Sequence, residues 1–228
     1  MFPWRHRSQE QLEAELYDQI SNSQFPCVGA KAALARGNLA VLACDNITSA
    51  WDDLRIHDAL LTFTTKYQKQ PELFRSFAVV FEGPGDLSEE DFERNLWARA
   101  QSLSDKDAWR GLSYDTRVSP DPTNPHFSLS FGGEAFFIVG LHPQASRPAR
   151  RFPYPTLVFN LHDQFEKLRE QGKYEGMREK ILERDEALAG SRNPMLMRFG
   201  EGSEARQYSG RRVDESWEAP FEYHGDKD

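Results

Sequence analysis

One histidine and three arginines stand close together near the middle of the chain and could hold a charged ligand. His142 directly follows an apolar run that ends at Leu141, and Arg147, Arg150 and Arg151 come shortly after it. Imidazole is a common ligand of iron and zinc, and guanidinium groups bind carboxylates and phosphates through paired hydrogen bonds. These residue types predict a site for a metal-containing or anionic group. The alternatives are a structural histidine at a strand end and a solvated basic surface.

A second candidate pair lies in a segment that is expected to be helical. His162 and Glu166 are four residues apart, so on a helix their side chains share a face. Together with His142 or His126 they could form the two-histidine, one-carboxylate set that binds non-haem iron. The same spacing is also that of an ordinary surface pair one helical turn apart.

Cys27 lies just before the expected start of a short helix. A cysteine in that position can have a lowered pKa and bind a metal as the thiolate. The alternative is a small buried apolar side chain. The chain has one other cysteine, Cys44, and neither a CxxC nor a CxxCH motif. This cysteine pattern argues against a disulfide framework and against covalent haem attachment.

The C-terminal segment, residues 190–228, is polar and contains several glycines. Such a segment becomes ordered only through contacts with the rest of the protein or with a ligand, so it is expected to close over the domain. Its side chains with binding potential are Glu204, Arg206, Tyr208 and Arg211. A carboxylate there, or at Asp185, could hold a guanidinium or an amine. The alternative is a tail that is fixed by ordinary salt bridges.

A hairpin is expected to position His142 and the arginines. Phe127 to Phe131 (FSLSF) alternates apolar and small polar residues, which predicts a half-buried strand. Gly132-Gly133 is typical of a tight turn, and the apolar run from Ala135 to Leu141 predicts a strand that is buried on both faces. We expect this hairpin to be central in the sheet and to present its polar end to a ligand.

The other elements form a regular pattern along the chain. Strands are predicted at residues 38–44, 76–82 and 156–160, and helices at 8–22, 48–67, 88–100, 161–168 and 174–188. Residues 1–20 supply the N-terminal helix, for which Ser8 is the expected cap, and Ser88 is the expected cap of the helix at 88–100. Residues 105–125 are expected to form a long loop over the site, and the alternative is a short helix at residues 105–110. Because the hairpin interrupts the alternation of strand and helix, we predict one α+β domain over residues 1–228, with a mainly antiparallel sheet packed by helices.

Composition limits the classes of function. The net charge of −8 argues against a general nucleic-acid-binding protein. No apolar run is long enough to span a membrane, and the N-terminus lacks the apolar core of a signal peptide. The 16 phenylalanines indicate a substantial core or a flat hydrophobic ligand. These features predict a cytoplasmic protein with no nucleic-acid or membrane partner, and they leave a homodimer open.

Several motifs together resemble the YqcI/YcgG family. They are FPCVGAK at Phe25–Lys31, GLHPQASRPARRF at Gly140–Phe152 and SEARQYSGR at Ser203–Arg211. The resemblance extends over roughly residues 20–221. Some members of that family are haem-dependent N-hydroxylases that act on guanidino groups such as that of arginine. The resemblance therefore implies non-covalent haem b, dioxygen or peroxide as the oxidant, and a small cationic substrate.

The resemblance also implies roles for individual residues. His142 lies in the family's histidine motif and is the first candidate for the axial iron ligand, with His162 and Cys27 as alternatives. Charge alone, rather than the resemblance, assigns Arg147, Arg150 and Arg151 to the haem propionates. Further residues expected to contact the cofactor are Arg206, Tyr208 and Arg211. The carboxylates expected to anchor the substrate at the catalytic centre are Glu204, Glu166 and Asp185.

Three functions are compatible with these expectations. The first is a haem-dependent oxygenase that hydroxylates a nitrogen atom of a small cationic substrate. The second is a haem-binding sensor or carrier protein without turnover. The third is a non-haem iron enzyme that uses His142, His162 and Glu166.

Overall fold

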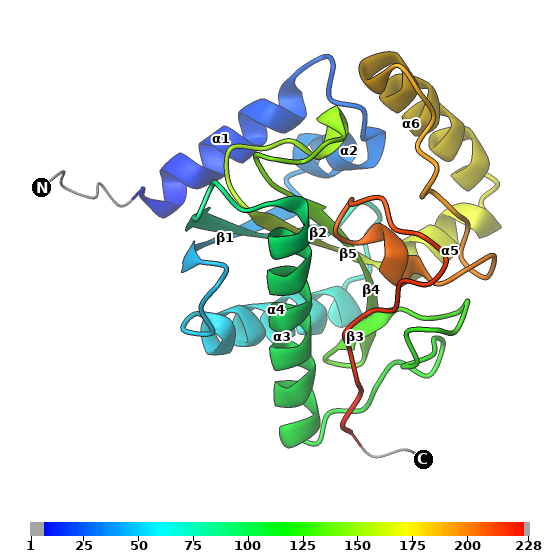
Figure 1. The fold of residues 1–228 in the computed structure, drawn as a ribbon. Helices are drawn as coiled ribbons and strands as arrows, with labels where there is room; N and C mark the ends of the chain where they lie inside the picture. The colour runs from blue at the N-terminus through cyan, green and yellow to red at the C-terminus, as the bar shows by residue number, and fades with distance from the viewer. Residues whose placement is uncertain (1–6, 226–228) are drawn as a thin grey trace, which may run out of the picture.

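A five-stranded sheet separates two groups of helices in the computed structural model, which describes residues 7–225 (Figure 1). The strands are β1 (Leu39–Asn46), β2 (Ser76–Gly83), β3 (Leu129–Phe131), β4 (Glu134–Leu141) and β5 (Thr156–Leu161), in the order β1-β2-β5-β4-β3. β1 and β2 are parallel, as a helical crossover requires, and the other neighbouring pairs are antiparallel. The predicted α+β class with a mainly antiparallel sheet is confirmed.

The helices agree with the predicted pattern, with two changes of boundary. They are α1 (Gln9–Ser21), α2 (Val28–Ala35), α3 (Asp53–Lys69), α4 (Glu89–Trp109), α5 (His162–Glu170) and α6 (Tyr174–Ala189), with short 3-10 turns η1 (Pro148–Arg150) and η2 (Glu204–Gln207). Ser8 caps α1 in a capping box, and Ser88 caps α4. α3 begins later than predicted, and α4 extends to Trp109, into the segment that was expected to be a loop.

The Gly-Gly hairpin joins β3 to β4 at the edge of the sheet rather than at its centre. Gly132 and Gly133 have φ angles of 60° and 78°, which side chains with a Cβ rarely adopt. A Cβ at Gly132 would also lie 2.7 Å from Oγ1 of Thr64 on α3. Turn geometry and close packing on α3 therefore both require glycine there. β3 is the edge strand, and β4 lies between β3 and β5.

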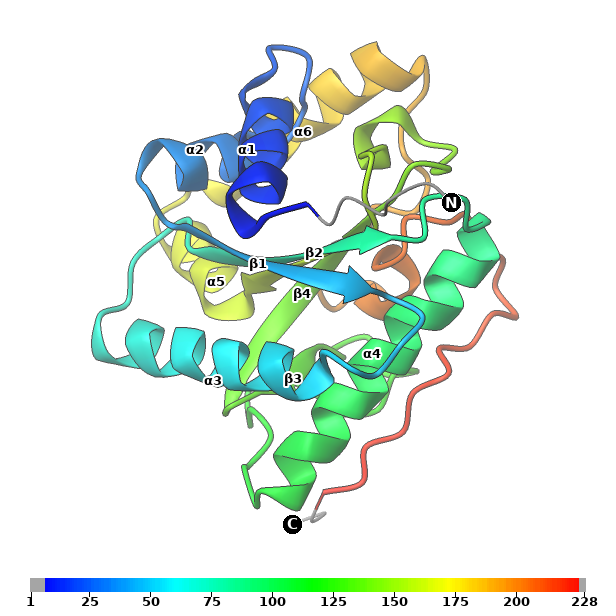
Figure 2. The same cartoon turned by 90° about the vertical axis from the view of Figure 1, so that its left-hand side faces the viewer.

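The two faces of the sheet have different coverings (Figure 2), with α1, α2 and α6 on one side and α3 and α4 on the other. Side chains alternate between the two faces along each strand. On β4, Phe136 and Ile138 belong to the larger apolar core, which also contains residues of α3 and α4. Leu141 belongs to the smaller core, which contains Leu12 and Leu16 of α1. The odd-numbered positions of β4 therefore face away from α4.

The C-terminal segment that follows α6, from residue 190 onward, is called the tail below. It passes the end of the sheet and then runs beside α4 (Figure 1). The Gly140 N–H donates to the carbonyl of Tyr208 at 2.7 Å, which attaches the tail to β4. Further on, Arg211 and the indole N–H of Trp217 both donate to Glu93 of α4. Phe221 is buried in the larger core. The tail thus contributes apolar side chains and ion pairs to the packing around α4.

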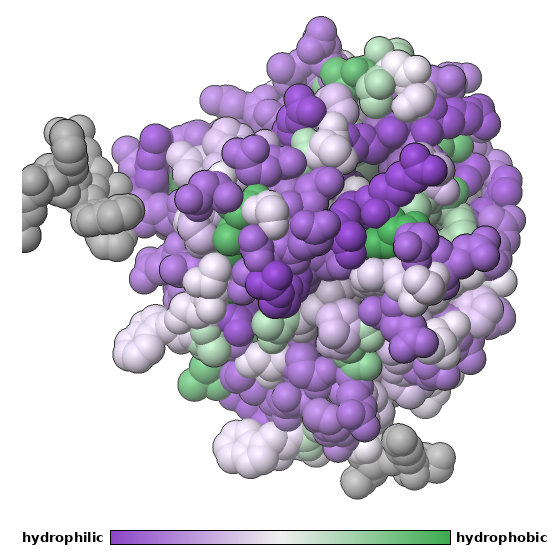
Figure 3. Space-filling model, viewed as in Figure 1, coloured by the Kyte–Doolittle hydropathy of each residue, from purple (hydrophilic) through white to green (hydrophobic). Residues whose placement is uncertain are grey.

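Polar side chains dominate the face of the molecule shown in Figure 3, where apolar side chains form small separate patches. Among the described helices, α1 to α6, none combines the length and the apolar character that crossing a membrane requires.

Candidate ligand cavity

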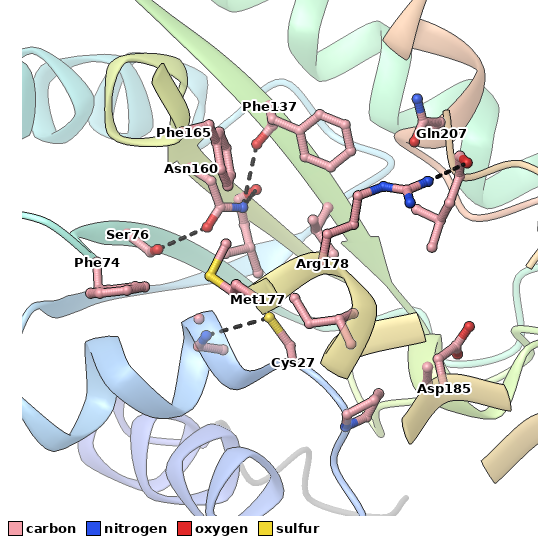
Figure 4. A pocket seen from close by; sticks show the side chains of 18 of the residues that line it. Cys27, Phe74, Ser76, Phe137, Asn160, Phe165, Met177, Arg178, Asp185 and Gln207 are labelled. Carbon is pink, nitrogen blue, oxygen red and sulfur yellow. Dashed lines mark hydrogen bonds between the residues drawn. The ribbon is translucent and has the colours of Figure 1, made fainter. Parts of the chain in front are cut away.

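A cavity of about 290 Å³ lies against the sheet face that is turned away from α3 and α4. Its floor consists of strand side chains such as Ala78, Val139 and Val158, and its other walls come from α1, α2, α5, α6 and the tail (Figure 4). The lining is mostly apolar, with a few polar groups at defined places. Such a composition is typical of sites for small molecules and organic cofactors.

Aromatic side chains give the cavity flat walls. Phe74, Phe137 and Phe165 all line it (Figure 4). Phe74 has a φ angle of 60°, which is an outlier for a bulky residue, and its ring packs under the guanidinium of Arg36 at 4.6 Å. Strained backbone of this kind persists only where the surrounding contacts hold it in place. The wall at Phe74 is therefore a fixed part of the cavity.

Cys27 lines the cavity as the N-cap residue of α2. Its Sγ accepts a hydrogen bond from the Ala30 N–H at 3.4 Å (Figure 4). Burial raises the pKa of the thiol, although the backbone N–H groups of Ala30 and Gly29 and the charge of Arg150 act in the opposite direction. Coordination to a metal ion deprotonates a thiol. Cys27 is thus an inert thiol by itself and a suitable ligand for a metal held in the cavity.

Two of the lining arginines have structural partners. Arg147 forms an ion pair with Asp185 of α6 and also donates to the Ser191 carbonyl at 2.7 Å. Arg150 is buried and donates to the carbonyls of Gly140 and Gln207 at 3.0 and 3.1 Å. Burial lowers the pKa of Arg150 to about 10, so it stays charged at neutral pH. Both side chains are held by the protein itself, although they border the cavity.

Two further arginines on the wall were not expected from the sequence. Arg169 of α5 is paired with Glu166. Arg178 of α6 donates to the Leu196 carbonyl at 3.3 Å, and within residues 7–225 it forms no ion pair (Figure 4). The helical period contained this signal, because Arg178 and Asp185 fall on the same face of α6 as the buried Leu182. The cavity therefore has a guanidinium that is available for a ligand.

The charges that line the cavity do not balance. The lining contains the guanidinium groups of Arg147, Arg150, Arg169 and Arg178, against the carboxyl groups of Asp185 and Glu204. Asp185 is already neutralised by Arg147, and Arg169 is paired with Glu166, so the excess positive charge belongs to Arg150 and Arg178. An excess of positive charge in an apolar cavity favours a ligand that carries negative charge.

The three carboxylates expected at the catalytic centre have different environments. Asp185 is used by Arg147, so it is not available to a substrate. Glu166 is 43% exposed at its side chain and contacts Arg169 and His162 rather than the cavity. Glu204 is buried on the cavity wall, where it forms hydrogen bonds with hydroxyl groups. Of the three, Glu204 alone borders the cavity without an ion pair to a described residue.

His142 lies on the opposite face of the sheet from the cavity. Its ring stacks on Phe92 of α4, with 4.3 Å between centroids and an angle of 16° between the planes. Phe92 can approach because position 140 is glycine, where a Cβ would lie 2.7 Å from the Phe92 ring. His142 does not line the cavity. The expectation that the hairpin aims His142 at the ligand is therefore not met.

The buried imidazole of His142 predicts an acid-dependent loss of stability. Burial lowers the pKa of His142 from 6.5 to about 4. The unfolded chain therefore binds this proton first as the pH falls, and stability decreases from pH 6.5 to about 4 by about 3 kcal/mol. Urea unfolding at several pH values is expected to show this slope in the native protein and a shallower one in His142→Gln. Parallel curves for the two proteins would contradict the prediction.

The remaining residues expected to bind the cofactor lie outside the cavity. Arg151 donates to the carbonyls of Ala145 and Ser146, and Arg206 donates to the carbonyl of Asp214. Arg211 forms its ion pair with Glu93 of α4. The ring of Tyr208 is buried in the larger core. These four side chains hold the loop after β4 and the tail in place, and the structure gives them no contact with the cavity.

A three-residue iron site does not form. His162 lines the cavity, and its Nε2 lies 3.2 Å from Glu166 Oε1. His142 lies across the sheet, and the part of the chain from residue 7 to 225 contains no group of three His, Cys, Asp or Glu side chains that could hold a metal ion. The proposed set of His142, His162 and Glu166, or the same set with His126, is thus not assembled.

Comparison with known proteins agrees with the sequence motifs. No curated protein and no solved structure matches the chain. A family model described as the YqcI/YcgG family matches residues 16–222, which include every element from α2 to η2. The matched region contains both Cys27 and the cavity walls. On this match, the chain belongs to the YqcI/YcgG family.

Proposed function

We propose that this protein is a cytoplasmic haem-dependent oxygenase that hydroxylates a nitrogen atom of a small guanidino- or amino-bearing substrate. Haem b would lie in the cavity, where Cys27 would hold the iron. The observation that supports this most directly is the position of Cys27, whose sulfur lines an apolar cavity at the start of α2. Membership of the YqcI/YcgG family, some of whose members are haem-dependent N-hydroxylases, supports the same function.

The residues of the cavity suit the chemical parts of a haem. The iron needs a single protein ligand, and Cys27 supplies a thiol. The porphyrin needs apolar and aromatic walls, for which Phe74, Phe137 and Phe165 are placed. The propionates need cations, and Arg178 has no carboxylate partner among the described residues. When bound, a thiolate-ligated haem would supply oxygen activation, because the thiolate donates electron density that favours O–O cleavage.

The side chains of this protein would control the surroundings of that chemistry. The apolar floor from the sheet excludes water, which strengthens every polar contact in the cavity. Asn160 and Gln207 also line the cavity, and their amides can orient a guanidino or amino group by hydrogen bonds. Glu204 offers a carboxyl group at the same wall. We propose that the substrate lies among these polar groups, with its reacting nitrogen toward the haem.

A visible spectrum tests the cofactor part of the proposal. Protein expressed with a haem supply is expected to show a Soret band. Its ferrous carbon monoxide form is expected to absorb at the longer wavelength that distinguishes a thiolate ligand from an imidazole ligand. Protein that stays colourless after reconstitution with haem would rule out the proposed function.

A turnover assay distinguishes an oxygenase from a haem-binding sensor or carrier protein. The loaded protein is incubated with arginine, other guanidines and simple amines in the presence of a reductant and dioxygen, or with peroxide. Mass spectrometry is expected to find a product that is heavier by one oxygen atom. A protein that binds haem but consumes no substrate-dependent oxygen would be a sensor or carrier instead.

A further inference from the structure

Glu204 is a carboxyl group that the fold holds in a polar setting on the wall of an apolar cavity. The residue is 4% exposed and lines the cavity. Its Oε1 accepts hydrogen bonds from the hydroxyl groups of Ser128 and Tyr208, at 2.6 and 2.7 Å. Both hydroxyl groups also lie within hydrogen-bond distance of the Phe136 carbonyl, at 3.0 and 3.3 Å. Two separate segments of the chain thus converge on this one oxygen atom.

The polar and charged groups around Glu204 come from four places. Ser128 precedes β3, and Tyr208 follows η2 in the tail. Arg169 of α5 favours the ionised carboxylate electrostatically, and Tyr114, in the loop after α4, interacts with Glu204 electrostatically. Burial outweighs the two hydroxyl groups and Arg169 and raises the pKa of Glu204 to about 7. The neutral acid is therefore populated near neutral pH.

The two oxygen atoms of the Glu204 carboxyl group have different surroundings. Because Ser128 and Tyr208 both donate to Oε1, that oxygen acts as an acceptor. Oε2 has no hydrogen bond to a described residue and is the oxygen that can carry the proton. Once the proton leaves, the same two hydroxyl groups stabilise the carboxylate that remains. The arrangement suits a group that gives up a proton to the cavity.

We propose that Glu204 is the proton donor for oxygen chemistry in this cavity. The inference rests on the proposed function. N-hydroxylation by dioxygen converts R–NH₂, O₂, two electrons and two protons into R–NHOH and H₂O. The electrons come from an external donor of the flavin or iron–sulfur class, and one of the protons passes from Glu204 Oε2 to the oxygen atom that leaves as water. Solvent then reprotonates the carboxylate.

Glu204→Gln and Glu201→Gln provide a matched comparison. In Glu204→Gln the amide oxygen of the new side chain can still accept from Ser128 and Tyr208, but the variant has no acidic proton. Glu201 lies in the same tail, is exposed, and pairs with Arg198. We expect both variants to bind haem with the native spectrum. Product formation is expected to fall about a hundredfold in Glu204→Gln, as is typical when a general acid is removed, and to stay unchanged in Glu201→Gln.

Infrared spectroscopy of the haem-free protein provides a readout that is independent of activity. The C=O stretch of a protonated carboxylic acid is expected in the native protein and in Glu201→Gln, and it should disappear with a midpoint near pH 7. Glu204→Gln should lack this band. In the loaded native enzyme, product formation should fall as the pH rises through the same midpoint, because the acid loses its proton.

Tyr208→Phe distinguishes proton donation from a structural role. The Tyr208 hydroxyl lowers the pKa of Glu204, so its removal should shift the infrared midpoint and the activity profile to higher pH together. Ser128→Ala should produce the same shift if Tyr208→Phe does not fold. The proposal that Glu204 donates the proton is overturned if Glu204→Gln makes product at the native rate. It is also overturned if the native protein lacks the infrared band of a protonated carboxylic acid. A protein without any haem spectrum would overturn the proposed function as well, so the two failures are distinguishable.

Discussion

Cys27→Ser is expected to lose the thiolate-type haem spectrum and nearly all N-hydroxylation, while it folds as the native protein does. Serine is a preferred N-cap residue, so Oγ can accept from the Ala30 N–H as Sγ does now. Serine cannot act as the electron-donating thiolate. Loss of groups that merely orient a metal ligand costs up to about a hundredfold, so removal of the ligand itself should cost at least roughly that much. Carbon monoxide spectra and product formation measure the effect.

Cys44→Ala is the matched control for that experiment. Cys44 is 2% exposed and lies in the larger core, on the sheet face away from the cavity. Burial raises the pKa of the Cys44 thiol to about 12, so it is not a thiolate at neutral pH. Cys44→Ala should keep the spectrum and the activity. A thiolate-type spectrum that persists in Cys27→Ser would contradict the assignment, and an imidazole-type spectrum in the native protein would favour His162, the histidine that lines the cavity.

Arg150→Met is expected to destabilise the protein by about 3–5 kcal/mol, because a buried hydrogen-bonded charge is replaced by a side chain without donors. Arg150 donates to the carbonyls of Gly140, Gln207 and Tyr208, at 3.0, 3.1 and 3.3 Å. Those contacts join β4 to the tail beside the cavity. Without them, buried carbonyl groups lose their partners and the tail loses an attachment. Urea unfolding and proteolysis of the tail measure the two effects.

Arg151→Met is the control, because Arg151 is exposed and donates to carbonyl groups of its own loop. Its cost should stay below about 1 kcal/mol, as is usual for surface substitutions. Equal losses in the two variants would contradict a special structural role for Arg150. If Arg150→Met weakened haem binding with no change in the free energy of unfolding, Arg150 would bind a propionate, as its charge and position in the sequence suggested.

Local patterns in the sequence determined most of the elements. The apolar run from Ala135 to Leu141 and the glycines before it predicted the hairpin, and Ser8 and Ser88 marked two helix starts that the structure confirms. A hairpin and a helix start depend on residues that are neighbours in the sequence, so both can be predicted from a short segment alone. The family motifs are equally local, and the family match confirms them.

The sequence could not show which side chains meet at the cavity. Alternation along β4 separates His142 from Leu141, but it does not say that α4 covers one face and that a cavity lies on the other. That choice depends on contacts between distant segments, such as Phe92 with His142 and Arg150 with the tail. For the same reason Cys27, far away in the sequence, lines the cavity, whereas His142 does not. Tertiary packing, rather than motif membership, decided the composition of the site.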